Sequence, residues 1–305
     1  MLMPTATRVL TIGSRGSQLA LWQARFIASL LENAGVATRI EIIKTTGDHL
    51  QTASLTQAGG KGLFTKEIEE ALLGHAIDLA VHSLKDLPTE SPEGLTIAAI
   101  PERENPFDAM VGNTLMNLRA GARVGTSSGR RAAQLRLLRP DLLIEPVRGN
   151  VDTRLRKQKA GEFDAILLAA AGLRRLGLEA EIAQIFTPDQ LCPAPGQGAL
   201  AIQTRLQDEA YAVCQQLNHP ATSEAVRCER ALLSRLGGGC QLPVGAFAQR
   251  SGELLHLMGV VVAPDGSKQL RVSVQGKSGA PEELGQSAAA ELLSKGAAQL
   301  LTACD

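Results

Sequence analysis

One cysteine in this sequence stands where its thiol could carry an attached group. Cys240 follows three consecutive glycines, Gly237 to Gly239, which end a long helical pattern from Thr222 to Leu236. Glycine takes positive φ readily, so this backbone can bring a thiol close to another surface. We interpret Cys240 as an attachment point. A second interpretation stays open, in which the glycines cap the helix and Cys240 is a small core residue.

Cations, hydroxyls and glycines follow the predicted strands, in segments 14–17, 45–48, 85–86, 125–128 and 148–150. In open α/β sheets, ligands bind beyond the carboxyl ends of the strands, and the amides at a helix start favour anions. Arginine adds a planar fork that matches a carboxylate. The arginines concerned are Arg15, Arg130, Arg131, Arg148, Arg154, Arg174 and Arg175. We predict a cleft between two α/β domains for a ligand with several anionic groups, although a solvated helix surface explains any single arginine.

Asp86 is a carboxylate among these cations. It follows Lys85 directly after a buried-looking strand, and the Leu87-Pro88 turn comes next. A carboxylate beside cations stays ionised, and it can stabilise a cationic intermediate or take part in proton transfer. A structural Lys–Asp turn explains the same residues, so both interpretations stay open.

The elements that must position these residues alternate along most of the chain. Strands are predicted at 9–12, 39–44, 77–81, 95–100, 123–124, 142–147, 164–169 and 199–204, and helices at 19–33 and 65–73 and before residues 138 and 159. The proline-bounded segment 101–106 is predicted to be a hinge. After about residue 219, one helix, strands at 244–249, 254–262 and 269–274, and a helix from about 281 to 302 are typical of an α+β domain.

The predicted fold class is therefore α/β, with two lobes and a small C-terminal α+β domain. The first lobe comprises residues 1–101 with 199–217, where the chain crosses back, and the second comprises residues 102–198. Residues 218–305 form the C-terminal domain that carries Cys240.

Composition limits the classes of function. Lys+Arg and Asp+Glu balance at 31 each and aromatics are 3%, which argues against a nucleic-acid binder. No apolar run approaches membrane-spanning length, and residues 1–13 show no signal-peptide pattern, so we expect a cytoplasmic protein. The five cysteines form no C-x-x-C or metal-type cluster, so we predict neither a metal site nor a disulfide framework.

Seven segments carry a resemblance that covers nearly the whole chain. They are SRGSQLALWQA at 14–24, GGKGLF at 59–64, VHSLKDLP at 81–88, GTSSGRR at 125–131, RGNVDTRL at 148–155, PGQGA at 195–199 and GGCQ at 238–241. Together, and in this order, they resemble the porphobilinogen deaminase family, whose members are also called hydroxymethylbilane synthases.

The resemblance implies two lobes like those of periplasmic solute-binding proteins and a third domain that carries the cysteine. It implies a transferase of tetrapyrrole biosynthesis, which joins four porphobilinogen molecules head to tail, releases ammonia at each step and yields hydroxymethylbilane. It also implies a dipyrromethane cofactor, attached through a thioether to Cys240. The expected partner is the small-molecule substrate, with no nucleic acid and no membrane, and we expect a monomer.

The resemblance also implies roles for single residues. Each pyrrole carries an acetate and a propionate, so the growing product is a polyanion. Asp86 matches the catalytic aspartate, which would stabilise positive charge on the pyrrole when ammonia leaves. The residues expected to bind the cofactor are Cys240, Lys85, Asp86, Thr126, Ser128, Arg130, Arg131 and Arg154. Those expected to bind the substrate or growing chain are Arg15, Ser17, Arg148, Arg154, Arg175 and Gln197.

A rival hypothesis is a two-lobed binding protein for an anionic solute, without chemistry. It predicts an export signal, which the sequence does not show, and it gives Cys240 and the third domain no use. A regulatory sensor with the same lobes is a further possibility, but the balanced charge and the lack of a helix-turn-helix pattern argue against it.

Overall fold

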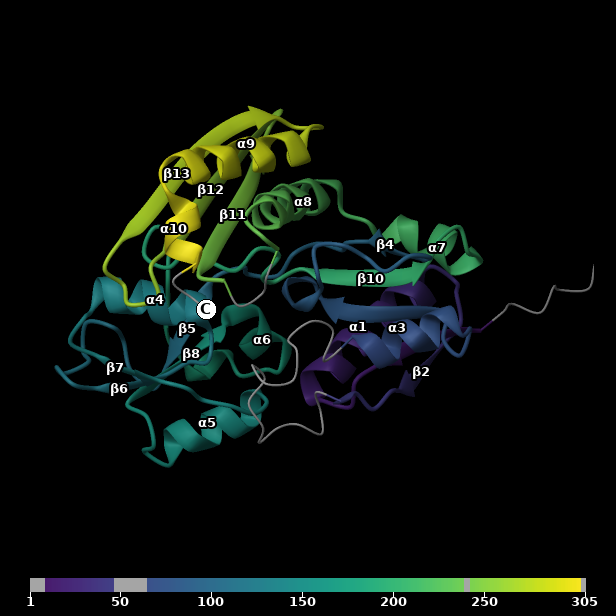
Figure 1. Cartoon of the computed structure of the whole chain (residues 1–305). Helices are drawn as coiled ribbons and strands as arrows, with labels where there is room; N and C mark the ends of the chain where they lie inside the picture. Colours follow the sequence, from purple (N-terminus) through teal and green to yellow (C-terminus); the bar gives the residue numbers. More distant parts are fainter. Residues whose placement is uncertain (1–8, 47–64, 239–241, 303–305) are drawn as a thin grey trace, which may run out of the picture. The chain divides into compact units, whose positions relative to one another are not determined.

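The structure, a computed structural model, describes residues 9–46, 65–238 and 242–302. The chain forms two compact units. The first unit comprises Met1–Glu102 and Leu200–His219, and the second comprises Arg103–Ala199 and Pro220–Asp305. The second unit contains two separate sheets (Figure 1).

The first unit is built on a five-stranded sheet with the order β2-β1-β3-β10-β4. The strands β1, β2 and β3 are parallel, and β10 is antiparallel to both β3 and β4. The strands are β1 (Leu10–Ser14), β2 (Thr38–Ile42), β3 (Leu79–Ser83), β4 (Leu95–Ala99) and β10 (Leu200–Arg205). The helices are α1 (Gln18–Asn33), α3 (Lys66–Leu73) and α7 (Glu209–Cys214), with short 3₁₀ helices η1 (Leu84–Asp86) and η3 (Gln215–Leu217).

The strand β3 is buried on both faces of this sheet. Successive side chains of a strand point to opposite faces, so they enter different cores. On one face, Leu79 and Val81 of β3 belong to the same core as Ile27 of α1. On the other face, Ala80 belongs to a core with Leu72 of α3. A strand that is covered on both faces reads as a nearly continuous apolar run, which is why β3 could be predicted from the sequence.

The second unit repeats this arrangement in its first sheet, with the order β7-β6-β8-β5-β9. The strands β6, β7 and β8 are parallel, and β5 is antiparallel to β8 and β9. The strands are β5 (Asp108–Val111), β6 (Arg123–Gly125), β7 (Leu143–Glu145), β8 (Ala165–Ala169) and β9 (Ile182–Ile185). The helices are α4 (Gly129–Leu138), α5 (Val151–Lys159) and α6 (Ala170–Arg175), with the 3₁₀ helix η2 (Glu179–Glu181). The predicted α/β class with two similar lobes is confirmed.

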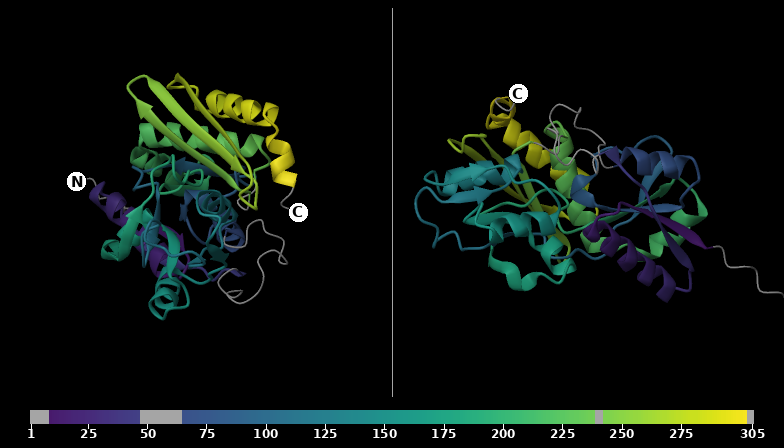
Figure 2. Two further views of the ribbon diagram at one scale, coloured as in Figure 1. Left: turned by 90° about the vertical axis from the view of Figure 1, so that its left-hand side faces the viewer. Right: turned by 90° about the horizontal axis from the view of Figure 1, so that it is seen from below.

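A three-stranded antiparallel sheet, β11-β12-β13, completes the second unit. Its elements are α8 (Pro220–Arg235), β11 (Val244–Ser251), β12 (Leu254–Val262), β13 (Gln269–Lys277), α9 (Pro281–Ser294) and α10 (Ala297–Thr302). The helices α8 and α9 lie along the same sheet, and Figure 2 shows it from two further sides. Leu232 of α8, Leu257 of β12 and Leu292 of α9 share one buried core. Gly285 allows the two helices to approach closely, since a Cβ there would lie 2.3 Å from the Cys228 carbonyl oxygen.

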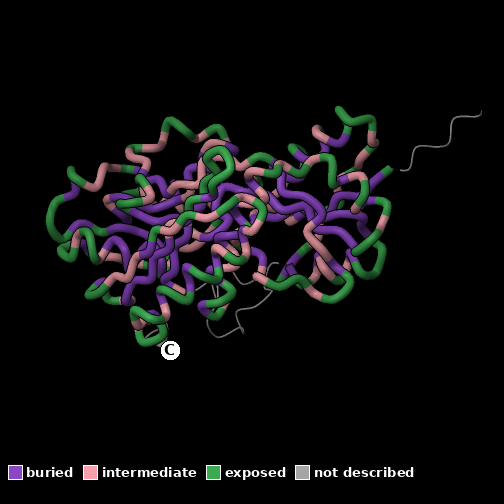
Figure 3. Tube along the Cα trace, turned by 90° about the horizontal axis from the view of Figure 1, so that it is seen from above, coloured by how far each residue is buried: buried purple, intermediate pink, exposed green. Residues whose placement is uncertain are grey.

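The structure differs from the prediction mainly in its short elements. The predicted final helix, 281–302, is two helices, because Gly296 takes a φ of +98° between α9 and α10. The strands β5 and β9 and the helices α6 and α7 were not predicted. Figure 3 colours the trace by burial, and β5 and β10 are buried along their whole length whereas β2 has no buried residue. Within the described ranges, no helix is long and apolar enough to span a membrane.

Candidate functional site

In the first unit, the predicted catalytic residue lies at the carboxyl end of a buried strand. Asp86 is exposed and Lys85 half-buried, and both stand in η1 directly after β3. Leu84 and Leu87 on either side are 0% and 5% exposed. The two leucines therefore anchor a short turn that presents the Asp86 carboxylate outward.

Two side-chain contacts hold the end of β3 just before this turn. Gln23 of α1 donates to the Ser83 hydroxyl at 2.8 Å. The His82 Nε2 lies 3.1 Å from the Gln203 side-chain oxygen on β10. Burial lowers the pKa of His82 to about 4, so its imidazole is neutral near pH 7.

The end of β1 lies at the same edge of this sheet, because β1 and β3 are parallel. Ser17 is the N-cap of α1, and its hydroxyl accepts a hydrogen bond from the Ala20 amide at 3.3 Å. Arg15, in the turn between β1 and α1, is half-buried. The topology thus brings Arg15, Ser17, Lys85 and Asp86 to one sheet edge, and their part in binding a ligand stays a prediction.

In the second unit, the ends of β6, β7 and β8 form the corresponding edge. Thr126 is buried just after β6, and its hydroxyl accepts a hydrogen bond from the Ser128 amide at 3.2 Å. Ser128 is half-buried and caps α4, accepting from the Arg131 amide at 3.4 Å. These capping bonds fix the first turn of α4, where Arg130 and Arg131 stand.

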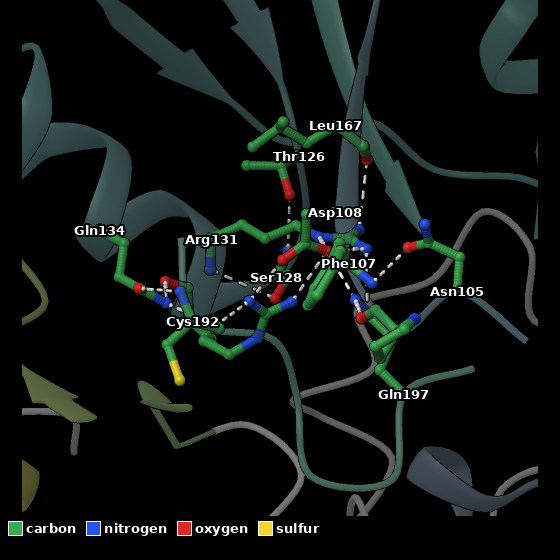
Figure 4. A network of polar contacts seen from close by, with 12 residues as sticks. Asn105, Phe107, Asp108, Thr126, Ser128, Arg131, Gln134, Leu167, Cys192 and Gln197 are labelled. Carbon is green, nitrogen blue, oxygen red and sulfur yellow. Dashed lines mark hydrogen bonds and ion pairs between the residues drawn. The ribbon is translucent and has the colours of Figure 1, made fainter. Parts of the chain in front are cut away.

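Arg130 and Arg131 pair with a buried carboxylate that was not recognised in the sequence, Asp108. Figure 4 shows Arg131 and Gln197 beside it. Asp108 is 0% exposed, and its oxygens accept from Arg130 Nη1 at 2.7 Å and Arg131 Nε at 2.8 Å. Burial alone would raise the pKa of Asp108, but the two guanidiniums hold it well below its usual range. Asp108 therefore stays ionised and paired throughout the physiological range.

Gln197 joins the same network from the loop before β10. It is fully buried, and its amide donates to the Pro106 carbonyl at 2.8 Å and to Asp108 Oδ1 at 3.0 Å. Arg175 is 8% exposed and donates to the Gly198 carbonyl at 2.6 Å. Burial lowers the pKa of Arg175 to about 10, an effect partly opposed by Glu104, and the guanidinium remains charged near pH 7.

Arg148 and Arg154 flank the start of α5 and are half-buried. The Arg154 Nε donates to the Gly149 carbonyl at 2.8 Å, which turns the side chain back toward the end of β7. Gly149 has a φ of +106°, and a Cβ there would meet the Thr153 side chain at 2.7 Å. Glycine is therefore required where the chain enters α5. Arg174, the remaining predicted arginine, pairs instead with Glu104 and Glu179.

Two parts of the predicted site lie outside the described residues, namely Cys240 and the segment 59–62. The helix that leads toward Cys240 is described. It ends as predicted, because Gly237 and Gly238 take φ values of +109° and +70°. Cys192, Cys214 and Cys228 are buried. In the described part of the chain, no group of three or more His, Cys, Asp or Glu residues could hold a metal ion.

Asp108 and Glu229 are two fully buried carboxylates that were not recognised in the sequence. Asp108 heads the apolar run Ala109 to Val111, where an acidic residue needs a buried partner. That position indicates a buried carboxylate once the short strand is known, but it does not identify the partner. Glu229 stands at a core position of α8 and pairs with Arg103, and helical periodicity gave no reason to single it out.

Comparisons with known proteins agree over nearly the whole chain. Residues 10–213 match the family model "Porphobilinogen deaminase, dipyromethane cofactor binding domain", and residues 223–294 match "Porphobilinogen deaminase, C-terminal domain". The porphobilinogen deaminase of Geobacter sulfurreducens is 48% identical over 96% of this chain and 93% of its own length. That of Pelobacter propionicus is 50% identical over 96% of each chain.

Solved structures with a similar chain path are much more distant in sequence. The methionine-binding protein MetQ covers 68% of this chain and 89% of its own, with 12% identity and a TM-score of 0.45.

Proposed function

The chain belongs to the porphobilinogen deaminase family, and we propose that it is a transferase that joins four porphobilinogen molecules into hydroxymethylbilane in tetrapyrrole biosynthesis. At each step a carbon–carbon bond forms between the aminomethyl carbon of one unit and the free α-carbon of the preceding pyrrole. The carbon–nitrogen bond breaks, ammonia leaves, and the α-carbon loses a proton. Water finally releases the product.

The observation that carries the proposal is the placement of Asp86. Its carboxylate is exposed on a turn whose neighbouring leucines are buried, so it can approach a bound ligand without unfolding the strand end. Loss of ammonia leaves positive charge on the pyrrole, which a fixed carboxylate stabilises more in the transition state than in the ground state. Asp86 is therefore the proposed catalytic residue.

We also propose a dipyrromethane group bound through a thioether to Cys240. When bound, it supplies the primer to which substrate units are added. The residues at the sheet edges fit a group with several carboxylates, because they combine arginines with capped hydroxyls. The proposed cofactor-binding residues are Cys240, Lys85, Asp86, Thr126, Ser128, Arg130, Arg131 and Arg154.

The remaining predicted residues have a related proposed task. Arg15, Ser17, Arg148, Arg154, Arg175 and Gln197 bind the acetate and propionate groups of the incoming substrate and growing chain. Arginine forks suit this task, since two parallel hydrogen bonds fix the orientation of a carboxylate.

The finer organisation is also proposed. Residues 218–305 form a separate domain that presents Cys240, which is supported by the core shared by α8, α9 and the three-stranded sheet. The protein acts as a monomer in the cytoplasm, with no nucleic-acid or membrane partner. The balance of 31 basic and 31 acidic residues and the lack of C-x-x-C spacing support this environment.

The test is Asp86→Asn, which keeps the size of the side chain and removes its charge. Turnover of porphobilinogen should fall about 100- to 1,000-fold, the usual effect of removing one electrostatic contact to a transition state. Circular dichroism should show an unchanged fold. Asp265→Asn, a change of an exposed carboxylate in the β12–β13 turn, is the control and should keep wild-type turnover. Wild-type turnover in Asp86→Asn would refute the role of Asp86.

A further inference from the structure

Asp108 lies at the sheet edge that holds the proposed carboxylate-binding residues of the second unit. It is the first residue of β5, and in the ladder it is opposite Ala169, the last residue of β8. Because β5 runs antiparallel to β8, the start of β5 meets the ends of the parallel strands. A buried carboxylate thus stands beside cations whose proposed ligands are themselves carboxylates.

The carboxylate of Asp108 already accepts four hydrogen bonds. Oδ2 accepts from Arg130 Nη1 at 2.7 Å. Oδ1 accepts from Arg130 Nη2 at 3.2 Å, Arg131 Nε at 2.8 Å and Gln197 Nε2 at 3.0 Å. Asp108 therefore has little capacity left to accept a hydrogen bond from a ligand, and its effect must pass through these three side chains.

The same contacts fix where each guanidinium lies. Arg130 Nη1 also donates to the Cys192 carbonyl at 2.6 Å, and Arg131 Nη1 donates to the Leu167 carbonyl at 3.2 Å. A free arginine side chain loses rotamer entropy when it binds an anion. Here the loss occurs on folding, so the guanidiniums are already oriented when a ligand arrives.

The charge of Asp108 is as important as its shape. Arg130 and Arg131 are neighbours in the first turn of α4, and two guanidiniums so close repel each other. The ionised carboxylate between them offsets this repulsion inside the protein. An amide in its place would keep some hydrogen bonds but would remove the negative charge that both guanidiniums share.

We propose that Asp108 is a positioning residue, which holds Arg130 and Arg131 in the orientation in which they bind the carboxylates of the dipyrromethane group. The inference rests on the proposed function, because it assigns Asp108 a role in retaining the group at Cys240. Asp108 itself contacts neither the group nor the substrate.

The experiment measures how much the bound group stabilises the protein. Wild type and Asp108→Asn are each prepared before and after incubation with porphobilinogen, and the intact mass gives the loaded fraction. A ligand that binds only the folded state raises the melting temperature. In Asp108→Asn we expect a smaller loaded fraction, or a melting-temperature increase on loading reduced to roughly half that of wild type or less, since misplaced arginines hold the carboxylates poorly.

Asp78→Asn is the matched control. Asp78 is a buried carboxylate of the first unit, 7% exposed, and accepts hydrogen bonds from the Thr11 amide at 2.8 Å and from Arg205 at 3.4 Å. It precedes β3, at the opposite end from Asp86. Its removal should lower both melting temperatures and leave the increase on loading unchanged.

The outcomes separate the inference from the proposed function. If Asp108→Asn shows the wild-type loaded fraction and the full rise in melting temperature on loading, Asp108 is purely structural and the inference is overturned. If that variant does not fold, Asp108→Glu keeps the charge but moves it by one methylene. Asp108→Glu should show a smaller rise in melting temperature on loading than wild type, and an equal rise would again overturn the inference. A wild-type protein that gains no mass from porphobilinogen would instead overturn the proposed function, and the inference with it.

Discussion

Glu229 is the buried charge whose removal should destabilise the second unit most clearly. Its side chain is 0% exposed, and each carboxylate oxygen accepts one hydrogen bond from Arg103 and one from a backbone amide. Oε1 accepts from Arg103 Nη1 at 2.7 Å and Ala248 N at 2.8 Å. Oε2 accepts from Arg103 Nη2 at 3.1 Å and Gly196 N at 2.7 Å. One side chain thus links α8, β11, the loop before β10 and the start of the second unit.

In Glu229→Gln, an amide group replaces one of these oxygens. Its N–H groups would face one Arg103 N–H and one backbone N–H, so two buried donors lose their acceptor. The Arg103 guanidinium, whose side chain is 9% exposed, also loses its counter-charge. Breaking a buried pair by removing one partner costs about 3–5 kcal/mol. We expect a loss of that size in the free energy of unfolding.

Urea denaturation followed by circular dichroism measures this loss as a shift of the midpoint at constant slope. Glu282→Gln is the control. Glu282 of α9 pairs with Arg227 of α8, the helix that also holds Glu229, at 2.6 Å, but the Glu282 and Arg227 side chains are 45% and 50% exposed. That change should cost less than about 1 kcal/mol. Arg103→Met combined with Glu229→Met should be less destabilised than Glu229→Met alone, because no orphan charge remains. Equal losses in Glu229→Gln and Glu282→Gln would refute the reasoning.

Three further predictions use the same structure. Since burial lowers the pKa of His82 to about 4, only the unfolded chain binds this proton between about pH 6.5 and 4. Stability should therefore fall as the pH drops through that window, by up to about 3 kcal/mol, and His82→Gln should remove this part of the slope in pH-dependent unfolding. Gly35→Ala should lower the free energy of unfolding by about 1–2 kcal/mol, the usual cost of a side chain at positive φ. Gly198→Ala should lower it clearly more in thermal unfolding, although both glycines have φ near +80°. The reason is that a Cβ at Gly198 would lie 2.4 Å from the Glu104 carbonyl oxygen, whereas Gly35 has open space, so equal losses would contradict the clash. Burial raises the pKa of the Cys192, Cys214 and Cys228 thiols to about 12. Iodoacetamide should therefore leave these three thiols unalkylated in the folded protein and alkylate them after unfolding, which peptide mass mapping measures.

The end of a strand could be recognised where an apolar run precedes a turn. The run before Lys85 and Asp86 is buried on both faces of its sheet, so its end could be predicted, while the assignment of its polar turn to ligand binding stays a prediction. Ser128, the N-cap of α4, offers a comparable local signal that the sequence analysis did not use, because serine is favoured directly before a helix. In both cases the signal lies within a few neighbouring residues.

Contacts between distant segments could not be predicted in this way. Asp108 follows a segment bounded by Pro101 and Pro106 that lacks periodicity, and β5 is too short for its pattern to stand out. Its partners, Arg131 and Gln197, are 23 and 89 positions further along the chain. The order of the strands in the folded sheet therefore decides which arginines pair with a buried carboxylate. The local sequence does not show it.

The measurement that tests the proposed function most directly is the mass of the peptide that contains Cys240, after incubation of the protein with porphobilinogen. The proposal predicts an addition equal to two linked pyrrole units on this peptide, and none on the peptides of the buried cysteines. If Cys240 stays unmodified after the incubation, the deaminase proposal fails, and a binding protein for an anionic solute becomes the better account.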